Sequence, residues 1–135
     1  MSSEPGRRRL LLDTHTLIWG GADDRQLSRK VRRLIEDEDN VEVVVSAASA
    51  WEIATKARLG RLAWPQGNET VRRYAVRQGF SLLPISFEHA EHAGAWPQEH
   101  GDPFDRILAA QSALEDIPLA TNDQKIAAFD VKTVW

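Results

Sequence analysis

The chain has 135 residues, a length typical of a single domain. It contains no cysteine, which excludes disulfide bonds, thiolate metal sites and a cysteine nucleophile. It carries 17 Lys and Arg residues against 20 Asp and Glu residues, a net charge of −3. This charge by itself argues weakly against a nucleic-acid partner, because proteins that bind phosphates are usually basic.

The first nine residues are polar and include Pro5 and Gly6. We therefore expect a flexible tail over 1–9 and one domain over 10–135. The apolar run that follows the tail, Leu10 to Leu12, is much shorter than the about 7–15 apolar residues of a signal peptide or the about 20 of a membrane-spanning helix. The expectation is a cytoplasmic protein with no membrane partner.

In the first half of the chain, strand and helix patterns alternate. The apolar run at the start suits a strand buried on both faces, and the β-branched run VEVVV suits a second strand. Glycines mark the ends of two helices, at Gly20-Gly21 and at Gly60. In chain order, the expected elements are a strand at 10–12, helices at 14–19 and 28–37, a strand at 41–45 and a helix at 46–59.

The second half continues the same alternation, with loops marked by Pro65 and Pro97. The expected elements are a helix at 69–78, a strand at 80–85, helices at 86–93 and 102–115, a strand at 118–120, a helix at 123–129 and a strand at 131–134. This order predicts an α/β fold with a mainly parallel central sheet and helices on both faces. Such sheets bind ligands at the carboxyl ends of their strands.

Four acidic residues lie where such a site would form. Asp13 directly follows the first strand, and Asp123 follows the strand at 118–120. Asp105 lies in the first turn of the helix that begins at Asp102-Pro103, and Glu52 lies near the second turn of its helix.

Each of these residues, taken alone, is better explained by a structural role. Helix capping accounts for three of them, namely Asp13, Asp105 together with Asp102, and Asp123 together with Asn122. Glu52 fits a capping box with Ser49 or an i, i+4 pair with Lys56.

Taken together, the four carboxylates indicate a cation site. Two carboxylates about 4 Å apart repel by about 4 kcal/mol at an effective dielectric constant near 20. A hard cation removes that cost, and oxygen ligands without cysteine or paired histidine favour Mg²⁺ or Mn²⁺ over zinc. Such ions lower the pKa of bound water and stabilise charge on a phosphoryl group. The residues therefore predict a metal-dependent site for phosphoryl transfer or phosphodiester cleavage.

Four segments in this order resemble the PIN-domain ribonucleases, specifically the VapC-type toxins of bacterial toxin–antitoxin pairs. The segments are Leu10 to His15, Ser46 to Ala54, His100 to Gln111 and Ala120 to Asp123. The resemblance implies a PIN-like three-layer sandwich and Mg²⁺- or Mn²⁺-dependent endonucleolytic cleavage of RNA, often tRNA or rRNA. It also implies a homodimer bound to a small antitoxin protein whose tail covers the acidic pocket.

Carried over by position, the resemblance assigns roles to the four acids. Asp13 and Asp105 would be the most direct metal ligands, Glu52 would hold the metal or its water, and Asp123 would complete the pocket. Attack by water on the phosphorus would leave 5′-phosphate and 3′-hydroxyl ends.

Several neighbours are expected to support this site. Thr14, Ser46 and Asn122 would orient ligands or water, and Asp102 would cap the helix or support the ligands. His100 and Arg106 are expected to contact RNA or the antitoxin, with a surface ion pair as the alternative for Arg106. Trp51 is expected in the core.

Two other classes of function compete with the nuclease. A catalytically silent PIN-like module that binds protein or RNA has no reason to keep clustered charges. An aspartyl-phosphate enzyme fits poorly, because Asp13-Thr14-His15-Thr16 lacks the second aspartate of a haloacid-dehalogenase phosphatase and VEVVV is followed by Ser46 instead of an acceptor aspartate.

Removing the four proposed ligands from the 20 acidic residues leaves 16 against 17 basic ones, so the net charge fits an acidic pocket in a mildly basic surface. Basic residues cluster over 25–33, 56–61 and 72–77, as solvated helix faces or as a positive rim that guides RNA.

Overall fold

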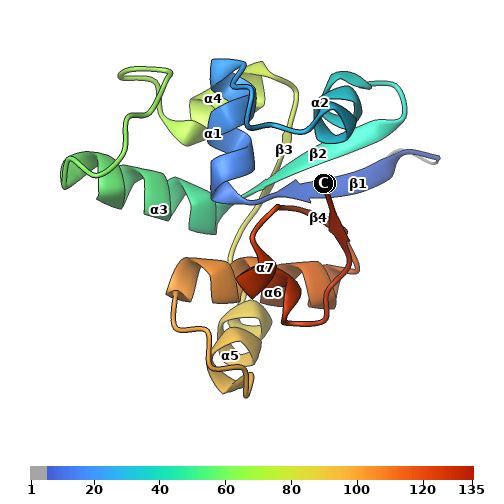
Figure 1. Ribbon diagram of the computed structural model, residues 1–135, viewed down its shortest axis with the longest axis vertical. Coiled ribbons are helices and arrows are strands. Elements are labelled where there is room, and N and C mark those ends of the chain that lie inside the picture. Colours follow the sequence, from blue (N-terminus) through green and yellow to red (C-terminus); the bar gives the residue numbers. More distant parts are fainter. Residues whose placement is uncertain (1–5) are drawn as a thin grey trace.

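A parallel β-sheet forms the centre of the protein in the computed structural model, which describes residues 6–135 (Figure 1). Every neighbouring pair of strands is parallel, and the strand order is β3-β2-β1-β4-β5. The strands are β1 (Arg8–Leu12), β2 (Val41–Ser46), β3 (Ser81–Leu83), β4 (Leu119–Ala120) and β5 (Thr133–Val134). The predicted parallel sheet is confirmed.

Helices cover both faces of this sheet, which confirms the three-layer α/β sandwich (Figure 1). The face with α1, α2 and α4 lies above the sheet in this view, and the face with α5, α6 and α7 lies below it. Their bounds are α1 (Thr14–Ala22), α2 (Arg29–Glu36), α3 (Ala47–Arg58), α4 (Val71–Arg77), α5 (Phe87–Ala95), α6 (Pro103–Glu115) and α7 (Gln124–Ala127).

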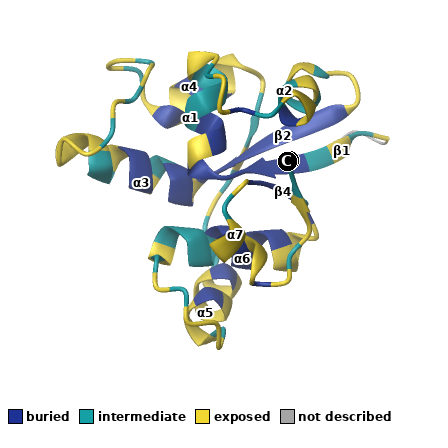
Figure 2. Cartoon of the chain, in the orientation of Figure 1, coloured by how far each residue is buried: buried dark blue, intermediate teal, exposed yellow. Residues whose placement is uncertain are grey.

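The apolar side chains of β1 alternate between two cores, as the geometry of a strand requires. Leu10 and Leu12 pack with α1, α2 and α4, whereas Leu11 packs with Leu108 of α6 and Ile126 of α7. All six residues of β2 are buried, so the centre of the sheet is dark blue in Figure 2. A strand buried on both faces is the environment expected for an unbroken apolar run.

Two elements differ from their predicted bounds. α1 runs through Gly20 and Gly21 instead of ending there, because a side chain at Gly21 would meet Gln66 and Tyr74, with a Cβ only 3.0 Å from Gln66 Nε2. Gly21 therefore allows Gln66 and Tyr74 to pack closely against α1. β3 is shorter than 80–85, since Phe80 still bonds to the end of α4 and Pro84 has no N–H to donate to a neighbouring strand.

The boundary of the N-terminal tail also needs correction. Arg8 and Arg9, which the composition places in the tail, pair with Val41 and Glu42 of β2, because the longer β2 offers backbone partners beyond Leu10. The expected flexibility of residues 1–5 lies outside the described residues. Over 6–135, no helix is long and apolar enough to cross a membrane.

Candidate active site

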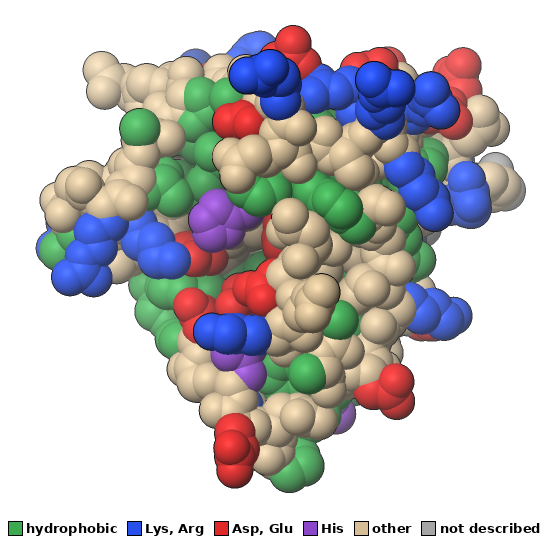
Figure 3. All heavy atoms as spheres, in the orientation of Figure 1, with side chains coloured by type: hydrophobic (Ala, Val, Ile, Leu, Met, Phe, Trp, Pro, Cys, Tyr) green, Lys and Arg blue, Asp and Glu red, His purple; other side chains and the backbone are tan. Residues whose placement is uncertain are grey.

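One cavity at the carboxyl edge of the sheet brings all four predicted acids together. Asp13 reaches it from the end of β1, Glu52 from α3, Asp105 from the start of α6 and Asp123 from the loop after β4. The cavity has a volume of about 420 Å³. Figure 3 shows Asp and Glu side chains gathered in the middle of this face, with Lys and Arg side chains beside them over the outer end of α3. The strand-end rule thus places the acids correctly.

Asp13 caps a helix and lines the cavity at the same time. Its Oδ1 accepts a hydrogen bond of 2.8 Å from the Thr16 N–H, so it is the N-cap of α1. Its side chain is buried, and this burial raises the pKa of Asp13 above the usual range, although hydrogen bonds with Thr121 and Thr16 oppose the shift. A buried carboxylate with a raised pKa is a group that a nearby cation would stabilise.

Asp105 does not cap α6, because Asp102 serves as the cap of this helix. Asp102 caps α6 by accepting from the N–H groups of Phe104 and Asp105, at 2.9 and 3.1 Å. The Asp105 Oδ2 instead accepts a 2.8 Å hydrogen bond from His100 Nε2. Burial raises the pKa of Asp105 to about 6, with smaller contributions from the charges of Asp102 and Glu52, and the bond to His100 opposes the shift.

Glu52 lies on the buried face of α3 and forms an ion pair with Lys56 one turn further on. Its Oε1 is buried and has no hydrogen-bond partner within residues 6–135. The hydrogen bond to Glu52 raises the pKa of Lys56, and the charges of Asp102 and Asp105 act in the same direction. Lys56 therefore lies in the combined field of three carboxylates.

Asp123 completes the acidic lining from the loop between β4 and α7. Its Oδ1 accepts from the Lys125 N–H at 2.9 Å and so caps α7, and its own N–H donates to Thr121 Oγ1 at 3.0 Å. Lys125 lines the same cavity. A second lysine thus faces the acids.

The donors in the cavity fit a hard cation, although they are not gathered into a closed ligand set. Within the described part of the chain, no three His, Asp or Glu side chains are grouped so that they could hold one ion. Instead, Glu52 bonds to Lys56 and Asp105 bonds to His100. The chemistry nevertheless suits Mg²⁺ or Mn²⁺, because the donors are carboxylate oxygens and the buried Glu52 Oε1 lacks a partner among these residues.

The supporting residues predicted from the sequence divide into two groups. Thr14 and Asp102 line the cavity, and the Thr14 hydroxyl bonds to that of Ser49 at 3.1 Å. Ser46 and Asn122 do not line it. Ser46 instead caps α3 by accepting from the Ala48 N–H at 2.9 Å, and Asn122 is exposed to solvent.

Trp51 lies differently from its predicted placement, and Arg106 differs from one of its two predicted alternatives. The guanidinium of Arg106 is turned inward onto backbone carbonyls instead of forming a surface ion pair. Trp51 is 52% exposed and packs edge-on against Phe104, with ring centroids 4.6 Å apart. The buried face of α3 contains Glu52 and Ile53, which leaves Trp51 on the opposite side of the helix.

Sequence reasoning missed several polar residues of the cavity. Lys125 lines it, and Thr121 bonds to Asp13 and Asp123. Their signal was weak, because each lies within one or two residues of a stronger acidic motif. The i, i+4 pair of Glu52 with Lys56, one of the alternatives that the sequence offered, is confirmed.

The fold and this site define an α/β protein with an acidic cavity at the carboxyl edge of a parallel sheet. The profile of the PIN domain family matches residues 10–132, and the chain belongs to this family. It is 28% identical to "Ribonuclease VapC22" of Mycobacterium tuberculosis over 93% of this chain and 98% of that protein.

Solved structures share the fold. The chain resembles VapBC2 from Rickettsia felis, solved with a DNA fragment from its promoter, with a TM-score of 0.65 and 13% identity over 94% of this chain and 98% of that one. It also resembles Mycobacterium tuberculosis VapC20, described as a sarcin-ricin loop cleaving toxin, with a TM-score of 0.62 and 16% identity over 90% and 95% of the two chains. At these identities, the likeness shows the shared architecture.

Proposed function

We propose that the protein is an Mg²⁺- or Mn²⁺-dependent RNA endonuclease, the toxin of a type II toxin–antitoxin pair. The observation that carries this proposal is the meeting of Asp13, Glu52, Asp105 and Asp123 in one cavity. A folded protein tolerates such mutual repulsion at a cost in stability, which a bound cation would remove. Membership of the PIN domain family and the likeness to a protein named ribonuclease support the same function.

The side chains of the cavity have distinct proposed roles. Asp13 and Asp105 would hold the ion, and Asp123 would close the cavity next to α7. The ion would lower the pKa of water and offset negative charge on a phosphoryl group. The Glu52 Oε1, free of protein partners within 6–135, can accept a proton from water. Lys56 and Lys125 line the cavity and attract the phosphate backbone of RNA.

The proposal extends to substrate and partners. RNA of the tRNA or rRNA class is the proposed substrate, in keeping with the similarity to a toxin described as cleaving the sarcin-ricin loop. A small antitoxin is the proposed inhibitor, because VapBC2 is among the structures that share the fold. We further propose that the protein acts in the cytoplasm as a homodimer.

A catalytically silent interaction module is the competing function. Such a module would gain nothing from raising the pKa of Asp105, which is not the cap of α6, to about 6. Perturbed carboxylates in a cavity are typical of functional sites, which favours the nuclease.

Cleavage of total RNA by wild type, by Asp105→Asn and by the exposed control Glu91→Gln separates these two functions. With Mg²⁺, wild type and the control should cleave equally. The cleavage rate of Asp105→Asn should be lower than that of wild type by more than about 100-fold. Mutation of residues that only support metal ligands already lowers metal affinity or activity by about 10–100-fold. EDTA should stop cleavage. Cleavage by Asp105→Asn at the wild-type rate, or by wild type in EDTA, would refute the proposal.

A further inference from the structure

Arg106 organises the chain segment between α5 and α6. Its Nε donates to the Ala93 carbonyl at 2.8 Å, and its Nη1 donates to the carbonyls of Gln98 and His100 at 2.6 and 2.8 Å. Its Nη2 donates to the Trp96 carbonyl. One side chain therefore bonds to four backbone carbonyls of residues 93–100, a segment with no regular structure beyond the end of α5.

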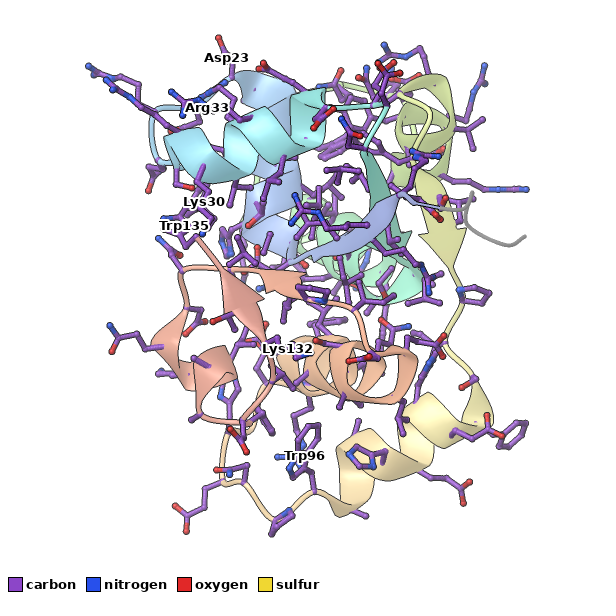
Figure 4. All side chains as sticks on the ribbon, turned by 90° about the vertical axis from the view of Figure 1, so that its right-hand side faces the viewer. Asp23, Lys30, Arg33, Trp96, Lys132 and Trp135 are labelled. Atoms are coloured by element: carbon purple, nitrogen blue, oxygen red, sulfur yellow. The ribbon has the colours of Figure 1, made fainter. Side chains whose placement is uncertain are left out.

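A buried aromatic ring fixes this arrangement from the opposite side. The Arg106 guanidinium lies 5.6 Å from the ring centroid of Phe129, which is 1% exposed. The rings of Trp96 and His100 pack on the same phenyl ring, with centroids 4.9 and 5.8 Å away. Trp96 lies below α6 and beside α5 in Figure 4. Phe129 and Arg106 thus hold this segment between them.

The segment ends at a residue that touches the acidic cavity. The His100 carbonyl accepts from Arg106, while the His100 ring donates to Asp105 Oδ2 at 2.8 Å. Asp105 directly precedes Arg106 in α6. His100 is therefore bonded through its carbonyl to Arg106 and through its ring to Asp105, two adjacent residues in the first turn of α6.

We propose that Arg106 is a positioning residue, which orients the carboxylate of Asp105 by fixing the backbone that carries His100. This role rests on the proposed nuclease function. The guanidinium suits it because five N–H donors in a rigid plane bind several carbonyls at once. A lysine keeps the charge but presents a single point of attachment, so it cannot hold the four carbonyls together.

Two measurements test this role without relying on RNA cleavage. The first is NMR of the histidine ring N–H groups in the metal-free protein, with the His100 signal assigned by its loss in His100→Gln. Arg106→Lys should shift or broaden this signal, because the segment is released. The signal of buried His89, whose Nε2 lies 2.9 Å from Glu115, should stay unchanged and report an intact fold. Lys132→Ala, which removes an exposed cation elsewhere, should change neither signal.

The second measurement is the affinity for Mn²⁺. Arg106→Lys and His100→Gln should each weaken binding by about 10-fold, the scale expected for partners of metal ligands. The double variant should bind Mn²⁺ as tightly as His100→Gln alone, because both changes break the same connection. If Arg106 had a merely structural role, the loss of Mn²⁺ affinity in the double variant would be the product of the losses in the two single variants. Arg106→Ala repeats the test if Arg106→Lys disturbs the His89 signal.

An unchanged His100 signal in Arg106→Lys, or multiplied losses in the double variant, would overturn the positioning role. If wild type cleaves RNA and binds Mn²⁺ in the same experiments, the positioning role alone falls. A wild type that neither binds Mn²⁺ nor cleaves RNA overturns the proposed function, and the positioning role with it.

Discussion

At the scale of single residues, capping a helix and serving the cavity are compatible. Asp13 and Asp123 each accept a backbone N–H at a helix start and still line the acidic cavity. The sequence presents these roles as alternatives, because a pattern such as Asp-Thr at a strand end fits either one. At α6 both Asp102 and Asp105 line the cavity, but only Asp102 caps the helix. This separation makes the region suitable for mutational tests.

Replacing Asp105 should stabilise the metal-free protein at neutral pH. The pKa of Asp105 is about 6 in the folded protein against 3.8 ordinarily, so the folded state binds the proton more tightly. Its contribution to stability therefore falls as pH rises from about 4 to about 6, and stays low above that. Asp105→Asn should raise the free energy of unfolding by about 1 kcal/mol above pH 6.5, after allowance for screening by solvent.

Urea denaturation in EDTA from pH 4 to pH 8 measures this difference. The gain should shrink as the pH approaches 4, where the wild-type carboxyl is protonated in the folded state and partly protonated in the unfolded state. A variant that is less stable than wild type at pH 7.5 would show that Asp105 acts mainly in helix capping.

At the scale of elements, local patterns predicted the starts of helices better than their ends. Asp102 as N-cap and Pro103 at the first position are confirmed at α6. The predicted end of α1 was wrong, because Gly21 lies against Gln66 and Tyr74, which are distant in sequence. Capping depends on neighbours within a few residues, whereas the use of a glycine depends on what packs against it.

The cap of α6 gives a prediction opposite in sign to that of Asp105. Asp102→Ala should lower the free energy of unfolding by about 1 kcal/mol, because two backbone N–H groups lose their acceptor. Asp102→Asn should retain most of the stability, since asparagine is an equally good cap. Thermal denaturation of the metal-free variants at pH 7 compares them. Equal melting temperatures for Asp102→Ala and wild type would contradict the capping role.

At the scale of the whole molecule, the parallel sheet explains why residues far apart in sequence share a cavity. The order of strands and helices was enough to predict the carboxyl edge of the sheet, and the sequence therefore indicated that the four acids lie together there, as they do in the cavity. The partners of these acids were harder to predict. The inward turn of Arg106 and the bond from His100 to Asp105 depend on the path of an irregular segment. No local pattern specifies that path.

The charge distribution of the molecule gives a further prediction. Arg58 and Arg61 are exposed at the last residue of α3 and shortly after it. Figure 3 shows Lys and Arg side chains over the outer end of this helix, beside the acidic side chains. If both contact RNA phosphates, the double variant Arg58→Ala/Arg61→Ala should bind single-stranded RNA more weakly. The slope of log affinity against log salt should fall by about 1.4, at about 0.7 per contact. Titrations with the Asp105→Asn background prevent cleavage during measurement, and an unchanged slope would exclude these arginines from RNA binding.

The location of a bound ion tests the central claim most directly. A crystal of the protein soaked in Mn²⁺ should give an anomalous density peak in the cavity, within about 2.5 Å of carboxylate oxygens of Asp13 and Asp105. The carboxylate of Glu52 should lie close to that ion or to a water on it. A peak elsewhere, with the cavity empty at Mn²⁺ concentrations that support cleavage, would contradict the account.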